Sequence, residues 1–345
     1  GSRFLRAEAV EVLSASPDRV VPPCPYAGPD ACGGCDFQHV SLARQRAMLA
    51  QVVREQLQRL AGVDWPVEVE VVPGDRGGLR WRTRATFTAT PAGQPGLCKH
   101  RSHDVVAVDD CRIASHSLPD VGAALRLGAP FAQAVVTSTG DSVVVAADGP
   151  CPVVSEEAIG RRWELHATDF WQVHPGAVAT LVAAVLDEVR PAAGERCWDL
   201  YSGVGLFSAA LAERVGPRGS VLAVESRHRA VEHARRNLVD LPQVRCVADR
   251  VDRFVRSRIA QGRLDVVVLD PPRSGAGRTV IQALVRQRPR AIAYVACDPA
   301  ALARDLATLD RHGYALTALR AFDIFPMTQH VECVAVCRPR ADGGS

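Results

Sequence analysis

The sequence predicts an α/β protein whose second half, residues 161–345, forms a doubly wound sheet with helices on both faces. Three observations predict this fold. Short apolar runs alternate with helical stretches from residue 195 onward. A glycine turn, Gly203-Val204-Gly205, follows the first apolar run and opens a helix. Polar or reactive residues follow several of these runs, at the strand ends where ligands bind in open α/β sheets.

The predicted strands of this half follow one another along the chain. They cover residues 197–201, 221–225, 244–249, 264–270 and 291–296, and a last strand follows the loop that begins at Phe325. Helices are expected over residues 176–189, after Gly205 and over residues 300–310. A strand–helix–strand alternation of this kind builds a parallel sheet with a Rossmann-like topology.

Residues 24–160 are predicted to form a β-rich central domain. Short β-forming runs, punctuated by Gly and Pro, cover residues 67–72, 82–89, 104–108 and 142–146. An amphipathic helix is expected over residues 41–61, ended by Gly62, and it can pack on the α/β domain. One predicted strand suits either a nucleic-acid-binding face or a solvated sheet face, because it carries Arg80, Trp81, Arg82 and Arg84.

Residues 1–23 contain one strand-like segment, Phe4 to Leu13, followed by a turn at Ser16-Pro17-Asp18-Arg19. A single strand cannot form a domain. We therefore interpret this segment as the last strand of a small β domain whose first part is absent from the sequence, or as an edge strand of the central domain.

The composition is that of an ordinary globular protein, with 47% apolar and 23% charged residues and a net charge of +3. Runs of about 18 apolar residues and a signal-peptide pattern are both absent, so we expect a cytoplasmic protein without membrane association. Lys99 is the only lysine, and the other basic residues are arginines, which suit phosphate contacts. Eleven cysteines without a secretory signal favour metal ligands, catalytic groups or core thiols over disulfides.

Three cysteines near the N-terminus predict a metal centre. Cys24, Cys32 and Cys35 have the spacing C-x7-C-x2-C, and Gly33-Gly34 lets the backbone wrap closely around a metal. For the fourth ligand, Cys111 is the first candidate, Cys98 is its rival, and His39, His100 and His103 are further options. Thiolate ligation with irregular spacing fits an iron–sulfur cluster, and a structural zinc ion is the alternative.

The glycine turn and the acids after the next two strands predict a nucleoside site. Gly203 and Gly205 allow a ligand to approach the backbone at the start of a helix. Glu225 ends the second strand 20 residues beyond Gly205, a placement that holds ribose hydroxyls, and Asp249 ends the third strand near the expected adenine. Because GxG is only half of a dinucleotide motif, S-adenosylmethionine is favoured over NAD.

A cysteine ends the fifth predicted strand, where Cys297 precedes the turn at Asp298-Pro299. Its thiol is either a small buried core group or a nucleophile at the edge of the sheet. Together with a methyl donor it suggests a reaction on uracil, because a thiolate added to carbon 6 makes carbon 5 nucleophilic. A base must then remove the proton from carbon 5, and Glu332 fits that role.

Six ordered motifs over residues 24–340 resemble the bacterial RNA 5-methyluridine methyltransferases that carry an iron–sulfur cluster. They are Cys24…Cys32-Gly33-Gly34-Cys35…Cys111 and residues 170–174, 199–205, 270–273, 294–299 and 325–332. The resemblance implies that a [4Fe–4S] cluster is held by Cys24, Cys32, Cys35 and Cys111. It implies that the S-adenosylmethionine site is lined by Gln172, Tyr201, Glu225, Asp249 and Asp270, with Cys297 as nucleophile and Glu332 as base. It also implies an RNA substrate, with 23S ribosomal RNA favoured over transfer RNA.

The sequence departs from the family pattern in three places. Leu206 stands where an asparagine is frequent, and Asp298 replaces another frequent asparagine. The family usually begins with a complete TRAM domain, an OB-like RNA-binding barrel, of which we expect only the last strand, over residues 3–15.

Two other functions compete with this interpretation. An RNA 5-methylcytosine methyltransferase typically has its cysteine after a proline in the fourth-strand motif, where this chain has Pro271-Pro272-Arg273. An RNA-binding or chaperone protein of the same fold without turnover is disfavoured by the presence of Cys297, Glu332 and Gln172. We expect the protein to act as a monomer.

Overall fold

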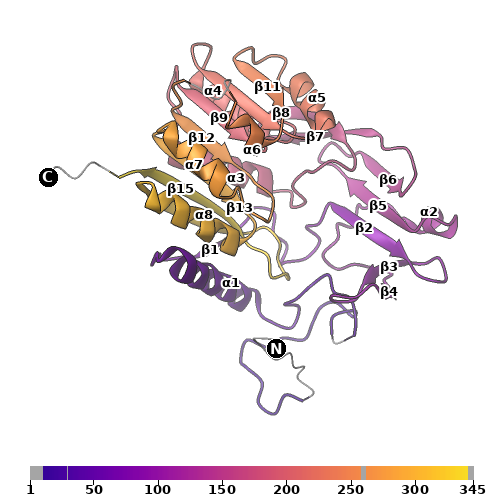
Figure 1. Ribbon diagram of the computed structural model, residues 1–345. Coiled ribbons are helices and arrows are strands. Elements are labelled where there is room, and N and C mark those ends of the chain that lie inside the picture. Colours follow the sequence, from indigo (N-terminus) through magenta and orange to yellow (C-terminus); the bar gives the residue numbers. More distant parts are fainter. Residues whose placement is uncertain (1–10, 29, 258–261, 341–345) are drawn as a thin grey trace.

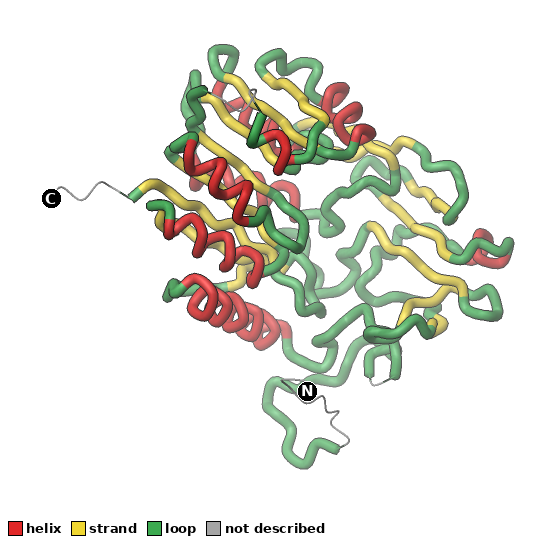
Figure 2. The backbone as a smooth tube through the Cα atoms, viewed as in Figure 1, coloured by secondary structure: helices red, strands yellow, loops and turns green. Residues whose placement is uncertain are grey.

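The computed structural model describes residues 11–28, 30–257 and 262–340 (Figure 1). The strand expected over residues 4–13 lies mainly outside these ranges. The described residues before the first helix are loops, apart from isolated bridges such as the one that pairs Arg19 with Val40 (Figure 2).

An eight-stranded sheet forms the body of the α/β part, with the order β1-β14-β15-β13-β12-β9-β10-β11. Its strands are β1 (Val69–Val71), β9 (Arg196–Leu200), β10 (Ser220–Glu225), β11 (Val244–Ala248), β12 (Val266–Leu269), β13 (Ala291–Ala296), β14 (Tyr314–Asp323) and β15 (Glu332–Pro339). Neighbouring strands are parallel except at β15, which runs antiparallel to both β13 and β14. The predicted α/β class is therefore confirmed, with one reversed strand that the sequence pattern did not predict.

Helices cover both faces of this sheet (Figure 1). One face carries α1 (Leu42–Gln56), α6 (Val251–Phe254), α7 (Arg278–Arg286) and α8 (Pro299–Arg311). The other carries α3 (Ala177–Val189) and α4 (Leu206–Val215), extended by α5 (His228–Asn237). The alternation within β12 explains the two layers, because Val267 and Leu269 pack on the first face while Val266 and Val268 pack on the second. Such doubly covered strands are apolar throughout.

The expected helix over residues 41–61 packs on the α/β part. It consists of α1 and a π-helical turn, η1 (Leu57–Ala61), and it ends at Gly62, whose φ of 67° is left-handed. Leu49, Val53 and Leu57 are buried in the same core as α8. The following strand, β1, then pairs in parallel with β14 at the edge of the large sheet. Residues 42–71 thus belong to the α/β layers, although the boundary expected at residue 160 groups them with the central domain.

The central part is a five-stranded antiparallel sheet with the order β4-β3-β2-β5-β6. Its elements are β2 (Arg84–Ala89), β3 (Pro95–Cys98), β4 (Val105–Ala107), α2 (Gly122–Arg126), β5 (Phe131–Val136) and β6 (Ser142–Ala146). A separate hairpin, β7 (Val153–Ala158) and β8 (Arg161–His166), contacts α5. This hairpin crosses the domain boundary expected at residue 160, since β7 precedes that residue and β8 follows it. The two strands are joined by a ladder of hydrogen bonds.

The strand around residues 80–88, expected to carry either a nucleic-acid face or a solvated face, has most of its basic and aromatic side chains packed within the protein. Trp81 and Arg84 are buried, and Arg80 donates two hydrogen bonds to the carboxylate of Asp110. Trp81 and Arg82 line the cleft described below. Further along β2 the exposure is mixed, because Ala85 is buried whereas Thr86 is exposed. No helix in the described ranges is long and apolar enough to cross a membrane.

Candidate active site

A cleft of about 1360 Å³ lies where several strands of the large sheet end. Loops from the cysteine-rich segment and from residues 325–330 form its other walls. The cleft brings together residues that are far apart in the sequence, and seven of the predicted site residues line it: Gln172, Tyr201, Gly203, Glu225, Asp270, Cys297 and Glu332. Gly205 and Asp249 are not among its lining residues.

The glycine turn is held by backbone conformations that favour glycine. Gly203 and Gly205 have φ angles of 54° and 97°, and Tyr201 also lies in the left-handed region, at 66°. Gly205 begins α4, but a Cβ there would lie 2.6 Å from Leu238 Cδ1. Its role is therefore close packing against α5, whereas Gly203 faces the cleft.

Glu225 is fixed at the end of β10 beside the turn. Its Oε2 accepts a hydrogen bond from Gly203 N at 3.2 Å, and its Oε1 accepts from Arg227 N at 2.7 Å. A carboxylate held in this way can accept further hydrogen bonds from the hydroxyl groups of a ribose.

Asp249, which was expected near the adenine, is not among the residues that line the cleft. Its Oδ1 accepts hydrogen bonds from Arg250 N at 2.7 Å and from Arg253 Nε at 2.5 Å, so the carboxylate is directed toward the start of α6. Arg250 and Asp252 line the cleft instead. The prediction missed them because the chain turns directly after β11, which moves the facing position from the strand end into α6.

Two acids lie beside the end of β9. Asp199 is fully buried, whereas Asp270 is half-buried and lines the cleft. Burial raises the pKa of Asp270 to about 7, and the charge of Asp199 adds to the shift. Burial likewise raises the pKa of Asp199 to about 7, although Ser208 Oγ donates a hydrogen bond to Asp199 Oδ2 at 2.6 Å. Sequence reasoning did not assign Asp199, which lies two residues before the glycine-turn Tyr201 and could have been found as a charge inside an apolar strand. A nearby positive charge stabilises an ionised carboxylate. These two acids therefore favour the binding of a positively charged ligand.

Cys297 follows β13 and enters the cleft because the chain turns sharply there. Asp298 caps α8, with its Oδ1 accepting a hydrogen bond from Ala301 N at 2.7 Å, and Pro299 occupies the first helical turn. Burial and the charges of Glu332 and Asp270 raise the pKa of the Cys297 thiol to about 11, whereas Arg273 lowers it. Arg273 is thus the cation that favours the thiolate.

Glu332 lies beside Cys297 because of the sheet register. Ala296 of β13 and Cys333 of β15 form the last pair of this antiparallel register, so Cys297 and Glu332 each stand one residue beyond it. Glu332 is 4% exposed, and burial together with the charge of Asp270 raises its pKa well above the usual range of a glutamate. A nucleophile and a carboxyl group therefore share one wall of the cleft.

The four predicted cluster cysteines gather in one place. Burial raises the pKa of Cys32 and raises that of Cys35 to about 12, and each shift includes charge contributions from Cys24 and Cys111. The rival ligand, Cys98, is exposed and contributes to neither shift.

The turn between Cys32 and Cys35 is closely packed. A Cβ on Gly33 would lie 2.4 Å from His100 N, so only glycine fits there. Gly34 N and Gln38 Nε2 donate to the sulfurs of Cys32 and Cys35, both at 3.4 Å, which stabilises thiolates. Gly33 and Gly34 also line the cleft, so the cysteine loop borders the active site.

The chain is similar to known RNA methyltransferases. Residues 170–338 match the family described as tRNA (Uracil-5-)-methyltransferase. The chain is 43% identical over 385 residues to an uncharacterised RNA methyltransferase of Streptomyces coelicolor, covering 99% of this chain and 84% of the relative. It is 33% identical over 386 residues to the 23S rRNA (uracil(1939)-C(5))-methyltransferase RlmD of Chromohalobacter salexigens, covering 96% of this chain and 78% of that protein.

The chain belongs to the RNA (uracil-5-)-methyltransferase family. It is accordingly an S-adenosylmethionine-dependent RNA methyltransferase, and the predicted family is confirmed. The crystal structure of the Pyrococcus abyssi tRNA (uracil-54, C5)-methyltransferase in complex with S-adenosyl-L-homocysteine has the same fold. The match has a TM-score of 0.70 at 22% identity and covers 95% of this chain and 88% of that one.

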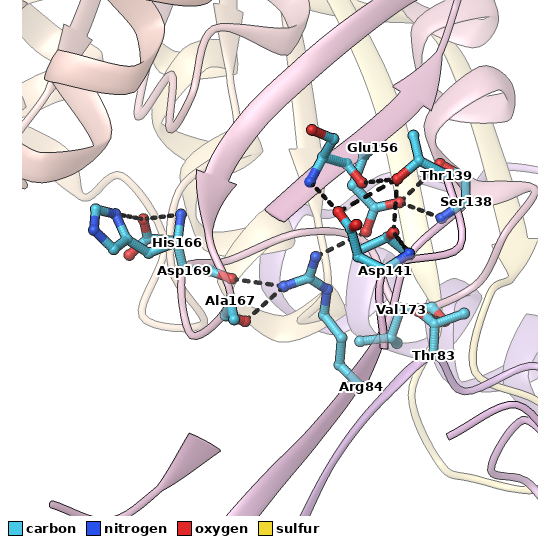
Figure 3. A network of polar contacts seen from close by, with 12 residues as sticks. Thr83, Arg84, Ser138, Thr139, Asp141, Glu156, His166, Ala167, Asp169 and Val173 are labelled. Carbon is cyan, nitrogen blue, oxygen red and sulfur yellow. Dashed lines mark hydrogen bonds and ion pairs between the residues drawn. The ribbon is translucent and has the colours of Figure 1, made fainter. Parts of the chain in front are cut away.

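In this methyltransferase a buried ion pair fixes the segment that carries Gln172 (Figure 3). Arg84 of β2 donates to Glu156 Oε1 at 2.8 Å and to the carbonyl of Ala167, also at 2.8 Å. Glu156 Oε2 accepts from the backbone and hydroxyl of Ser138, both at 2.9 Å. Thr83 Oγ1 donates to Val173 O at 2.9 Å. Contacts from Thr83 and Arg84 therefore hold both ends of residues 167–173.

His166, Asp169 and His233 form the second polar group of this segment. They are the described His, Cys, Asp and Glu residues whose potential ligating atoms all lie within 4.8 Å of one another. The two imidazoles already share a hydrogen bond, 2.7 Å between His233 Nε2 and His166 Nδ1. Arg229 donates to Asp169 Oδ1 and supplies the cation. The group is thus a hydrogen-bonded tie between α5 and residues 166–169.

The Glu156→Gln change is expected to destabilise the methyltransferase by about 3 kcal/mol, because it leaves the charge of Arg84 buried without a counter-charge. The side chains of Arg84 and Glu156 are only 4% and 5% exposed. Urea denaturation of the purified variant measures the effect. The matched control is Glu157→Gln at the adjacent exposed position, where a change within about 0.5 kcal/mol is expected. Equal losses in the two variants would show that the ion pair adds nothing to stability.

Proposed function

We propose that this methyltransferase modifies carbon 5 of a uridine in 23S ribosomal RNA through a covalent bond to Cys297. The observation that supports the mechanism is the pairing of Cys297 and Glu332 on one wall of the cleft. The similarity to RlmD over nearly the whole chain favours ribosomal RNA. Transfer RNA is the second candidate substrate, because the matching family is described by that substrate.

Cys297 begins the reaction as a thiolate. Its sulfur forms a bond to carbon 6 of uracil, and the electrons of the 5,6 double bond move toward the carbonyl oxygen at carbon 4. Arg273 favours the thiolate, since its positive charge opposes the effects of burial and of the two neighbouring acids. Carbon 5 is then a nucleophile, and S-adenosylmethionine, when bound, supplies an electrophilic methyl group to it.

Glu332 completes the reaction as the general base. Its carboxylate takes the proton from carbon 5, the 5,6 double bond forms again, and the bond between carbon 6 and the sulfur breaks to release the thiolate. The low-dielectric position of Glu332 raises its pKa and thereby makes it a stronger base than a glutamate in water.

The cofactor side of the cleft suits S-adenosylmethionine. Gly203 leaves the backbone open beside Glu225, whose carboxylate would hold the ribose. Gln172, Tyr201 and Asp270 line the same space. Asp270 would balance the positive charge of the cofactor, because its carboxyl group lines the cleft, where burial and the charge of Asp199 raise its pKa.

Cys24, Cys32, Cys35 and Cys111 would hold a [4Fe–4S] cluster. A zinc ion binds thiolates at about 2.3 Å, so four ligands of one ion would lie closer together than 4.8 Å. No group of three cysteines among the described residues meets that spacing. The four cysteines are therefore spread more widely than the ligands of one zinc ion would be. This spread, together with two N–H groups that donate to sulfur, fits a larger cluster better than a single ion. The cluster would be structural, because the mechanism includes no redox step.

The competing functions have less support. The fourth-strand corner, Pro271-Pro272-Arg273, contains no cysteine with which a 5-methylcytosine enzyme could attack. A binding protein without turnover would have no need of a cysteine and a buried glutamate paired beside a cofactor site.

A labelling experiment tests the proposal. Protein purified without oxygen is incubated with radiolabelled S-adenosylmethionine and total RNA that lacks 5-methyluridine, and the RNA is then separated by size. Label in the large ribosomal RNA is expected. Label confined to transfer RNA would reject the ribosomal substrate, and absence of label with cofactor still bound would reject turnover. Metal analysis of the same preparation should find iron, and a colourless protein that carries zinc would reject the cluster.

A further inference from the structure

The loop of residues 325–330 forms the wall of the cleft next to Cys297. Phe325, Thr328, Gln329 and His330 line the cleft, and the intervening Met327 does not. The Phe325 ring meets the His330 ring edge to face, with centroids 6.1 Å apart. His330 Nε2 lies 3.4 Å from the Arg273 guanidinium, the group that favours the thiolate. This wall is where a uracil base would rest before attack, because unstacked bases in RNA sites pack on aromatic side chains.

Met327 anchors this loop from the side away from the cleft. It is 5% exposed and lies in a cluster with Trp81, Ile113 and Leu42, beside Cys35 and Cys111. Its φ is 69°, a left-handed conformation that is rare for a residue with a long side chain. Such a conformation persists only where the surrounding structure determines it.

Gln45 of α1 makes some of the contacts that hold Met327 in this conformation. It is 1% exposed, and its Oε1 accepts from Met327 N at 3.0 Å. Its Nε2 donates to the carbonyls of Phe37 and Val40, at 3.0 and 2.8 Å. One amide therefore joins helix α1, the segment after the last cysteine of the N-terminal motif, and the wall of the active site.

Asp36, the residue directly after Cys35, makes further contacts that hold the loop. Asp36 N and Phe37 N both donate to Met327 O, at 2.9 and 3.0 Å. Asp36 Oδ2 accepts from Gln329 N at 2.9 Å. The loop is thus bonded to Asp36 and Phe37 at the carbonyl of its left-handed residue, and to Asp36 again at Gln329 N.

We propose that Gln45 and Asp36 are positioning residues for the target base. They hold the 325–330 loop in the shape that receives uracil against Cys297, and they act on neither the cofactor nor the base Glu332. Glu332 is placed by the pairing of β15 with β14, where it lies opposite Phe322, and this pairing includes neither Gln45 nor Asp36. This inference rests on the proposed uridine methylation and adds to it the residues that set the entry of the substrate.

The test uses RNA that contains 5-fluorouridine, in which carbon 5 carries no removable proton, so the covalent complex with the enzyme accumulates. In the full-length holoenzyme we expect Gln45→Ala and Asp36→Ala to slow the trapping of this RNA roughly 10- to 100-fold. Their affinity for S-adenosylmethionine should stay within about twofold of the unchanged protein. Asp36→Asn keeps the acceptor for Gln329 N and should restore most of the rate.

The matched control is Gln51→Ala on the same helix, where an exposed glutamine contacts Glu55 and not the loop. It should trap RNA at the unchanged rate. Trapping at normal rates by both Gln45→Ala and Asp36→Ala would overturn the proposal, as would a parallel loss of cofactor affinity. Failure of the unchanged protein to trap the RNA would instead refute the proposed uridine methylation. The experiment therefore distinguishes failure of the positioning role from failure of the proposed function.

Discussion

The Cys297→Ala variant is expected to lose methyl transfer by a factor of about 10⁴ or more, because no other group in the cleft can form the bond to carbon 6. The variant should also form no covalent complex with RNA that contains 5-fluorouridine. Its cofactor affinity should persist, since the proposed cofactor contacts are made by Gln172, Tyr201, Gly203, Glu225 and Asp270 and not by Cys297. Radiolabel transfer and denaturing gels measure the two effects.

A matched control for this variant is Cys246→Ala, in which another half-buried thiol is removed from β11, outside the cleft lining. It should retain full activity and full trapping. Methyl transfer that survives Cys297→Ala would refute the nucleophile assignment. A loss of activity in both variants would point to a general sensitivity of the fold to thiol removal.

The Glu332→Gln variant is expected to lower turnover by about 10² to 10⁴, the range for removing a general base. It should still attack uracil, so a covalent complex with ordinary RNA should accumulate, which the unchanged enzyme releases. Denaturing gels of RNA and protein after one turnover show this species. A variant that neither turns over nor accumulates the complex would show that Glu332 acts before proton removal.

The same variant is expected to be more stable than the unchanged protein at neutral pH. The folded-state pKa of Glu332 is raised, so the folded protein holds the proton more tightly than the unfolded chain. Stability from this group is therefore greatest below its unfolded pKa and falls as pH rises toward its folded pKa. Because the glutamine of the variant does not ionise, the variant does not lose this stability as pH rises. Urea denaturation at pH values on both sides of this window measures it, and the difference should vanish at low pH.

The α/β layers were predictable because their signals are local. Strands such as β12 and β13 are continuous apolar runs, and the glycine turn and the Asp-Pro corner mark where helices begin. Strand β14 was not predicted, because its alternating small and polar residues resemble an exposed segment. It enters the sheet by pairing with β15 on one side and with β1 on the other, and the pairing with β1 joins residues about 250 positions apart.

The proposed catalytic pair and the cysteine set could be suggested from sequence, because reactive residue types at the end of a strand or in a C-x2-C turn stand out without knowledge of their partners. Arg84 and Glu156 could not be assigned, since their importance depends on a partner in another strand. Arg80, Trp81 and Arg84 have the sequence pattern of a binding face, and only contacts such as those of Arg80 with Asp110 and of Arg84 with Ala167 show that they pack within the protein. Which residues after β11 line the cleft could not be predicted, because the chain turns into α6 directly after that strand.

Because β15 runs against its neighbours, it begins at the edge of the sheet where β13 ends. The proposed nucleophile and the proposed base therefore each stand one residue beyond the last pair of the same ladder, Ala296 with Cys333. The loop of residues 325–330 joins β14 to β15 and is not part of that ladder. We therefore expect an exchange of this loop in engineering to alter substrate choice more than the alignment of the two groups.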